Sequence, residues 1–243
     1  MVEIGHASID EYGKAAGGQA GDQTGKEVCT RSWYKKNWHT CLRPKSPTIA
    51  DSMAQACHRG CLNPNIGYDQ KQRNTLRTAA KEKQWDLSAI NVPCETDCSA
   101  FMAVCAEAAG VAMAPLYSAG NAPTTANMVQ KFYSTGMFDI LTDPVYLTQS
   151  DYLRHGDILV CKGHTVMVLT DGLKQLAKPI LHKGDKGSWV KVMQGRLTMA
   201  GFQLGVDGDF GPVTFNALVA FQGEHNLVKD GVCGPKTWNA LMC

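Results

Sequence analysis

The sequence predicts an α+β domain over residues 1–175, followed by a small all-α module over residues 181–243. A linker is expected at about residues 173–180. Three observations lead to this division. A twelve-residue phrase is duplicated near the C-terminus, a helical pattern opens at Cys98, and two short apolar runs flank Lys162-Gly163. A chain of 243 residues is long enough to build both domains.

The duplicated phrase predicts the fold of the C-terminal module. Asp207–Leu218 reads DGDFGPVTFNAL and Asp230–Leu241 reads DGVCGPKTWNAL, with eight of twelve positions identical at a spacing of 23 residues. In each copy Asp-Gly favours a tight turn, and Gly-Pro favours the first turn of a helix. Apolar residues then recur at helical spacing. Such copies are expected to stack, because one alone cannot bury its apolar face.

A helix is predicted from Cys98 to Gly110, where the chain reads CSAFMAVCAEAAG, with Thr96 or Asp97 as its cap. Cys98 therefore sits at a helix N-terminus. There the macrodipole favours a thiolate and lowers the thiol pKa, and the thiolate is the nucleophilic form. Cys105 lies two turns deeper, beyond that field, and is expected to be a core residue. Cys98 is the candidate nucleophile.

The base of a cysteine nucleophile is expected to be a histidine that is distant in sequence and near in space. Ile158–Cys161 and Thr165–Leu169 have the apolar pattern of two strands. His164 precedes the second strand, at its mouth, and is the favoured candidate. His155 competes with it, but stands in a polar turn and is expected to be solvated.

The remaining segments complete the predicted domain. Helices are expected at 48–57 and 70–83, and residues 125–141 are predicted to form a helix that leads into an edge strand. Segment 28–47 clusters Trp33, Tyr34 and Trp38 with basic residues. Such a cluster could bind glycan or acidic stem peptides, or it could be a packed loop with solvated lysines.

Both parts resemble known families. The tail from Leu181 to Cys243 is similar to the small helical peptidoglycan-binding domain of bacterial and phage cell-wall enzymes, which implies three helices. Asp97-Cys98-Ser99, Gly156-Asp157 and Gly163-His164, in that order, resemble the motifs of NlpC-type and CHAP-type cell-wall cysteine peptidases, including phage amidases. This resemblance implies a papain-like fold, in which the cysteine helix packs on an antiparallel sheet.

The resemblance also implies a polar residue that orients the histidine from the following strand. Asp171 is a poor candidate, because seven extended residues place it on the order of 20 Å from His164. We expect Val2–Ile9 to form a strand beside that of His164, which would make His6 the orienting residue. Asp22 and Gln23 are the competing source of that role or of substrate contacts. Tyr68 is a candidate oxyanion or substrate contact, or a buried anchor of its loop.

The leading functional hypothesis is an endolysin-like peptidoglycan hydrolase. It would cleave an amide bond of the stem peptide or cross-bridge by transfer of the acyl group to Cys98, with His164 as base. An N-acetylmuramoyl-L-alanine amidase with the same chemistry is the alternative, and a non-catalytic wall-binding or virion structural protein is the second. A glycosidase is disfavoured because Glu95 and Glu107 lack the pattern of a paired carboxylate site.

Composition limits the partners. The net charge of +2 argues against a nucleic-acid surface. The sequence has no apolar run of eighteen residues, so we expect no segment that inserts into a membrane. The start MVEIGHASIDEYGK lacks a secretory pattern, so we expect synthesis in a host cytoplasm and action on the wall after release.

Bacterial peptidoglycan is the expected partner, and no cofactor or metal is expected. A zinc site from His39, Cys57, Cys61 and Cys94 is disfavoured by the Cys-x-x-x-Cys spacing. Cys233 and Cys243 could pair as a disulfide. The sequence does not indicate an oligomeric state.

Overall fold

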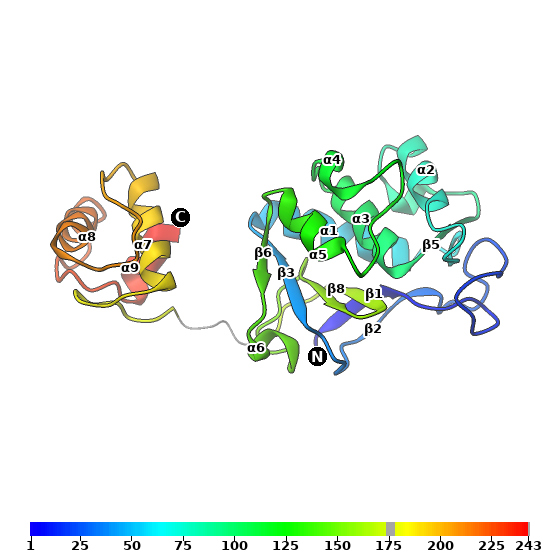
Figure 1. The fold of residues 1–243 in the computed structure, drawn as a ribbon, viewed down its shortest axis with the longest axis horizontal. Helices are drawn as coiled ribbons and strands as arrows, with labels where there is room; N and C mark the ends of the chain where they lie inside the picture. The colour runs from blue at the N-terminus through cyan, green and yellow to red at the C-terminus, as the bar shows by residue number, and fades with distance from the viewer. Residues whose placement is uncertain (174–177, 243) are drawn as a thin grey trace. The chain divides into compact units, whose positions relative to one another are not determined.

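The computed structural model describes residues 1–173 and 178–242, so part of the expected linker and Cys243 lie outside the described residues. The chain divides into two compact units, Met1–Gln175 and Leu176–Cys243. Figure 1 shows both units.

The first unit is built on a six-stranded antiparallel sheet with the order β2-β1-β8-β7-β3-β6. Its strands are β1 (Glu3–Ala7), β2 (Val28–Ser32), β3 (Thr40–Pro44), β6 (Phe138–Leu141), β7 (Ile158–Cys161) and β8 (His164–Val168). A separate parallel pair joins β4 (Ile66–Tyr68) to β5 (Cys94–Thr96). The expected edge strand is confirmed as β6, and the N-terminal strand does pair with the strand of His164.

Helices α1, α3 and α5 lie on one side of this sheet (Figure 1). The helical segments of the first unit are α1 (Pro47–Cys61), α2 (Thr75–Glu82), η1 (Leu87–Ala89), α3 (Cys98–Ala108), α4 (Met113–Leu116), α5 (Met128–Ser134) and α6 (Pro144–Leu147). The mixed architecture with an antiparallel sheet is confirmed, and the papain-like topology stays a prediction.

Alternation along the strands divides the buried residues into two cores. Met167 of β8 belongs to the core between the sheet and the helices, which we call the helix-side core. Val166 and Val168 belong to a smaller cluster with Trp38, which we call the outer core. Because successive side chains of a strand point to opposite faces, His164 starts β8 on the face of the outer core.

Local capping explains where the helices begin. Asp97 caps α3 as predicted, since its side chain accepts hydrogen bonds from the N–H groups of Ser99 and Ala100. The helix expected at 48–57 starts at Pro47, behind the cap Ser46, and runs on to Cys61. The helix expected at 70–83 begins only at Thr75.

The hairpin that carries His164 is anchored at its base. Asp157 is fully buried and receives two hydrogen bonds from Arg43, of 2.8 Å and 2.6 Å. Gly156 has a φ of +83°, and a Cβ there would lie 2.7 Å from Cα of Ala50. The Gly-Asp pair therefore allows a close approach of the hairpin to α1 and fixes it by a buried ion pair.

The second unit packs α7 (Ser188–Met199), α8 (Pro212–Glu224) and α9 (Pro235–Met242) around one apolar cluster. A buried glutamine of the preceding helix holds the Asp-Gly turn of each repeat. Gln222 Nε2 donates to Asp230 Oδ1 (2.8 Å), and its Oε1 accepts from the N–H of Gly231 (2.9 Å). Gln194 makes the same bonds to Asp207 and Gly208. The duplication thus includes its hydrogen bonds as well as its apolar residues.

In the described part of the chain, every helix is too short or too polar to cross a membrane.

Candidate active site

Cys98 is the first residue of α3, and its side chain is buried, with 5% exposure. Burial raises the pKa of the Cys98 thiol to about 12, and Asp97 adds to the rise. Hydrogen bonds to the sulfur from the N–H groups of Thr165 and Ser99 oppose it. The lowering expected from the helix dipole is therefore outweighed in the free protein, because this helix end is shielded from water.

The N-terminus of α3 is held by an ion pair. Arg73 Nε lies 2.9 Å from Asp97 Oδ2, and both side chains are largely buried. Arg73 Nη2 also donates to Ser99 Oγ at 3.0 Å and to the carbonyl oxygen of Pro123. These bonds tie the start of α3 to the segment of Arg73 and to the loop of Pro123.

His164 is held by aromatic residues of segment 28–47. Its Nε2 lies 2.9 Å from Tyr34 Oη, within hydrogen-bond range. The ring stacks on Trp38, with centroids 6.1 Å apart at 28°. Sequence reasoning did not assign Tyr34 to the histidine, although it singled out this aromatic cluster. The cluster proves to be packed against the site.

The helix that Cys98 starts contacts the strand that His164 starts, but no hydrogen bond joins the two side chains among the described residues. The N–H that donates to the Cys98 sulfur belongs to Thr165, the residue next to His164. Tyr34 occupies Nε2 of His164, and Nδ1 is the ring nitrogen that this contact leaves unengaged. The sulfur thus lies one residue from the histidine, in contact with the same strand.

His6 is close to His164 but is not hydrogen-bonded to it within the described residues. The two rings are edge to face, with centroids 5.8 Å apart. The Nε2 of His6 lies 3.4 Å from Cys29 Sγ, and its buried Nδ1 has no hydrogen-bond partner in the described structure. The orienting role of His6 stays a prediction, and the observed partner of the His164 ring is Tyr34.

Both imidazoles are neutral near pH 7. Burial lowers the pKa of His6 and of His164 to about 4. Arg31 and Lys36 contribute to the lowering at both rings, and His6 contributes at His164. A neutral imidazole is the form of histidine that can accept a proton as a base.

A polar pocket of about 450 Å³ opens against these histidines. Its polar lining comprises His6, Ser8, Arg31, Tyr34, Lys36, Tyr68, Gln70 and His164. Burial raises the pKa of Tyr68 to about 12, and Cys98 adds to the rise, so the phenol is protonated near pH 7. Gln70 Nε2 donates to Tyr68 Oη at 3.1 Å. The structure thus brings Tyr68 to the same pocket as His6 and His164.

Asp22 and Gln23 are engaged in their own loop. Asp22 Oδ1 accepts hydrogen bonds from the N–H groups of residues 24, 25 and 26. Gln23 Nε2 donates to the carbonyl oxygens of Ala20 and Gly21. These contacts stabilise the loop, and a role of either residue at the site stays a prediction.

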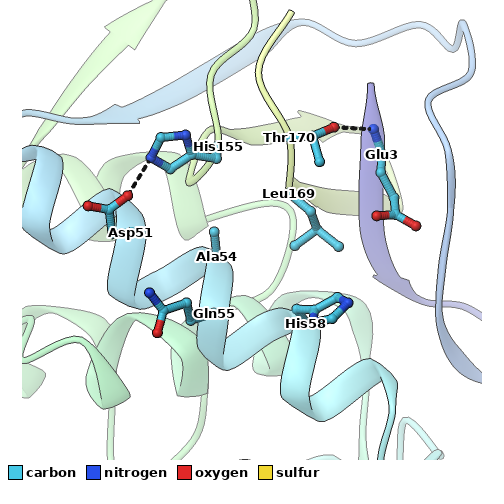
Figure 2. Close-up of a pocket in the computed structure, with 8 residues that line it drawn as sticks. All are labelled: Glu3, Asp51, Ala54, Gln55, His58, His155, Leu169 and Thr170. Carbon is cyan, nitrogen blue, oxygen red and sulfur yellow. Dashed lines mark hydrogen bonds and ion pairs between the residues drawn. The ribbon is translucent and has the colours of Figure 1, made fainter. Parts of the chain in front are cut away.

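His155, the competing base, lies in a different place. Its Nε2 is 2.7 Å from Asp51 Oδ1, and its Nδ1 is 2.7 Å from Asp171 Oδ1. Figure 2 shows His155 beside α1, where it lines a pocket of about 340 Å³ with Glu3 and residues of that helix. His155 is therefore half-buried between two carboxylates, where we expected a solvated ring. Asp171 pairs with His155 and not with His164.

Among the described residues, no group of three or more His, Cys, Asp or Glu side chains could hold a metal ion. Cys57 and Cys61 of the disfavoured zinc set lie together under β1, since a Cβ at Gly5 would meet their sulfurs at 2.5 Å and 3.0 Å. Cys105 and Cys161 are buried core residues, as predicted.

Two family matches cover most of the chain. Residues 4–175 match the family described as "Endolysin-like domain". Residues 186–241 match the family described as "Putative peptidoglycan binding domain". The first match spans more than half of the sequence, and the chain belongs to the endolysin-like domain family.

Individual relatives are similar over shorter stretches. The N-acetylmuramoyl-L-alanine amidase CwlM of Mycobacterium tuberculosis is 48% identical over 56 residues, 23% of this chain and 14% of that protein. The N-acetylmuramoyl-L-alanine amidase CwlL of Bacillus licheniformis is 41% identical over 83 residues, 32% of this chain and 23% of that protein. The chain thus spans less than a quarter of the length of either relative.

A solved structure of the Burkholderia AP3 phage endolysin is 44% identical over 26% of this chain and 24% of that chain. The TM-score of this match is 0.26.

Proposed function

We propose that this protein is a cell-wall hydrolase that cleaves an amide bond in the peptide part of peptidoglycan, with Cys98 as nucleophile and His164 as base. One observation carries the proposal. The Cys98 sulfur accepts a hydrogen bond from the N–H of Thr165, next to a histidine whose Nε2 is held by Tyr34. A thiol at a fixed helix end and an oriented imidazole on the strand that contacts this helix are the two groups that acyl transfer needs.

The reaction follows from these positions. The thiol proton passes to His164 as Sγ attacks the amide carbonyl, and the imidazolium then protonates the leaving amine. Water, with His164 again as base, hydrolyses the thioester. Asp97 already takes the N–H groups of Ser99 and Ala100, so the N–H of Cys98 is the helix-start donor left for the oxyanion. The protonated Tyr68 hydroxyl is the candidate side-chain donor, because Tyr68 lines the same pocket as His164.

The C-terminal unit supports the cell wall as the place of action. Residues 186–241 match a family named for peptidoglycan binding, and they form the compact three-helix unit described above. A module that binds the wall would hold the thiol near its polymeric substrate and raise its effective concentration there.

The proposal has two versions, an amidase and an endopeptidase, which differ in the bond that is cut. The curated relatives named above are amidases, which favours the bond between the sugar and the first stem residue. Those matches span only 56 and 83 residues, 14% and 23% of the relatives, so an endopeptidase is equally compatible. Cysteine chemistry serves either bond.

Mass spectrometry of digested walls tests the proposal. The wild type is expected to release new amino groups without new reducing ends, and the new terminus identifies the bond. A Cys98→Ser variant is expected to release neither, and chelation by EDTA is expected to leave wild-type turnover unchanged. New reducing ends would indicate a glycosidase, and loss of turnover with EDTA would indicate metal-dependent chemistry.

A glycosidase has little support from the position of its candidate carboxylates. Glu95 is 1% exposed and accepts a hydrogen bond from the N–H of Gly21 at 2.7 Å. Glu107 is buried and receives two hydrogen bonds from Arg77. Neither carboxylate is accessible to a sugar ring, which a glycosidase requires.

A further inference from the structure

The pocket beside the histidines has an unusual balance of charge. Arg31 and Lys36 line it, and no Asp or Glu belongs to its described lining. Both side chains are exposed at its rim. Throughout the described residues, neither of them forms an ion pair with a carboxylate, whereas Arg43, Arg73 and Arg77 all do. The two cations are therefore available to an anionic group that enters the pocket.

The two cations act on the proposed catalytic groups. The Arg31 guanidinium lies over the ring of Tyr34, 4.7 Å from its centroid, and Tyr34 Oη bonds to His164. Both cations lower the pKa of His6 and of His164, so their field extends across the pocket. An anion bound between them would lie beside the imidazole that serves the scissile amide.

We propose that Arg31 and Lys36 bind a carboxylate of the substrate peptide next to the bond that is cut. This inference rests on the proposed function, in which Cys98 cleaves a peptide of the wall. A planar guanidinium pairs with a carboxylate through two parallel hydrogen bonds, and Lys36 adds a second, point-like charge. The stem peptides of peptidoglycan carry free carboxylates, and a phosphate of another wall polymer is the competing source of negative charge.

Binding of a soluble stem peptide to the full-length Cys98→Ala variant tests the inference without turnover. We would measure its Kd by calorimetry for the peptide with free carboxylates and for the same peptide with every carboxylate converted to carboxamide. The free form is expected to bind about tenfold more tightly, a modest gain because exposed charges are screened by salt. Cys98→Ser provides the same measurement if Cys98→Ala does not fold.

The matched variants isolate the two cations. In Arg31→Gln/Lys36→Gln the preference for free carboxylates is expected to vanish, whereas in Lys35→Gln, an exposed neighbour outside the pocket, it is expected to persist. Equal Kd values for the two peptides, no binding of either, or a preference that survives the double substitution would each overturn the inference. So would binding of inorganic phosphate that depends on Arg31 while the two peptides bind alike.

Turnover by the wild type is scored separately. If the free peptide is bound through Arg31 and Lys36 but neither it nor purified wall is cleaved, the proposed function is wrong and the carboxylate site remains. If it is cleaved at the same rate with and without its carboxylates and the two forms bind alike, the hydrolase remains and the carboxylate site is wrong.

Discussion

At the scale of single residues, the hydroxyl of Tyr34 is the contact that most clearly orients the proposed base. Tyr34→Phe keeps the aromatic ring and removes the 2.9 Å bond to His164 Nε2. We expect kcat to fall by about tenfold with KM little changed, as when an orienting partner is lost. Tyr133→Phe, at an exposed position, is the matched control. An unchanged kcat in Tyr34→Phe would show that Tyr34 does not position the imidazole.

The low pKa of His164 predicts an unusual pH profile. The base must be neutral to accept the thiol proton, and its pKa is lowered to about 4. The acid limb of kcat/KM is therefore expected near pH 4, below the ordinary histidine value of about 6.5. Activity is present above that limb and is lost as the pH falls through it, because the imidazole then already holds a proton.

His6→Ala is expected to move this limb upward, because His6 contributes to the lowering at His164. Profiles of kcat/KM between pH 3.5 and 8 measure both effects, with circular dichroism as a check of folding. A wild-type limb near 6.5 would contradict the buried, neutral base, and an unmoved limb in His6→Ala would remove His6 from the site.

At the scale of elements, the two turn–helix units of the C-terminal module each depend on one buried glutamine. Gln222→Ala removes the hydrogen bonds to Asp230 and Gly231 and leaves a buried N–H without a partner. We expect a loss of about 2 kcal/mol in the free energy of unfolding. Denaturation of Gln203→Ala, at an exposed position, provides the control. Equal stability of the two variants would mean that the turns are held by backbone geometry alone.

The sequence predicted elements well where the deciding contacts are local. The cap at Asp97, the start of α3 and the hairpin that carries His164 all follow from residues within a few positions of one another. The second helix was predicted five residues early, because Asp69 Oδ1 accepts the N–H groups of Lys71 and Gln72 and holds a turn there. Such a side-chain turn competes with the helix and leaves little signal in hydrophobic periodicity.

The site was less predictable because its contacts are long-range. Tyr34 and His164 are 130 residues apart, and their bond depends on how β2, β1 and β8 pair. The thiol pKa depended on burial, which the position of Cys98 in a helix does not reveal. Position along an element could be predicted from the sequence, but solvation and cross-strand partners could not.

At the scale of the whole molecule, the division into two compact units predicts that cleavage and wall binding can be separated. A variant that ends at residue 175 lacks the unit Leu176–Cys243 but keeps Cys98, His164 and the pocket. We expect it to cleave a soluble stem peptide at a rate close to that of the full chain. Its sedimentation with purified walls should fall by at least tenfold, because the avidity of the module is lost. Unchanged wall binding would assign adhesion to the first unit.

The identity of the nucleophile is the claim on which the account depends, and thiols other than Cys98 lie near the histidines. Release of amino groups from purified walls should be compared in the wild type, Cys98→Ala and Cys29→Ala, since Cys29 Sγ is 3.4 Å from His6. We expect Cys98→Ala to lose at least about 10³-fold in rate and Cys29→Ala to stay close to the wild type. A Cys98→Ala protein that still releases amino groups at the wild-type rate, or a Cys29→Ala protein that does not, would contradict the account.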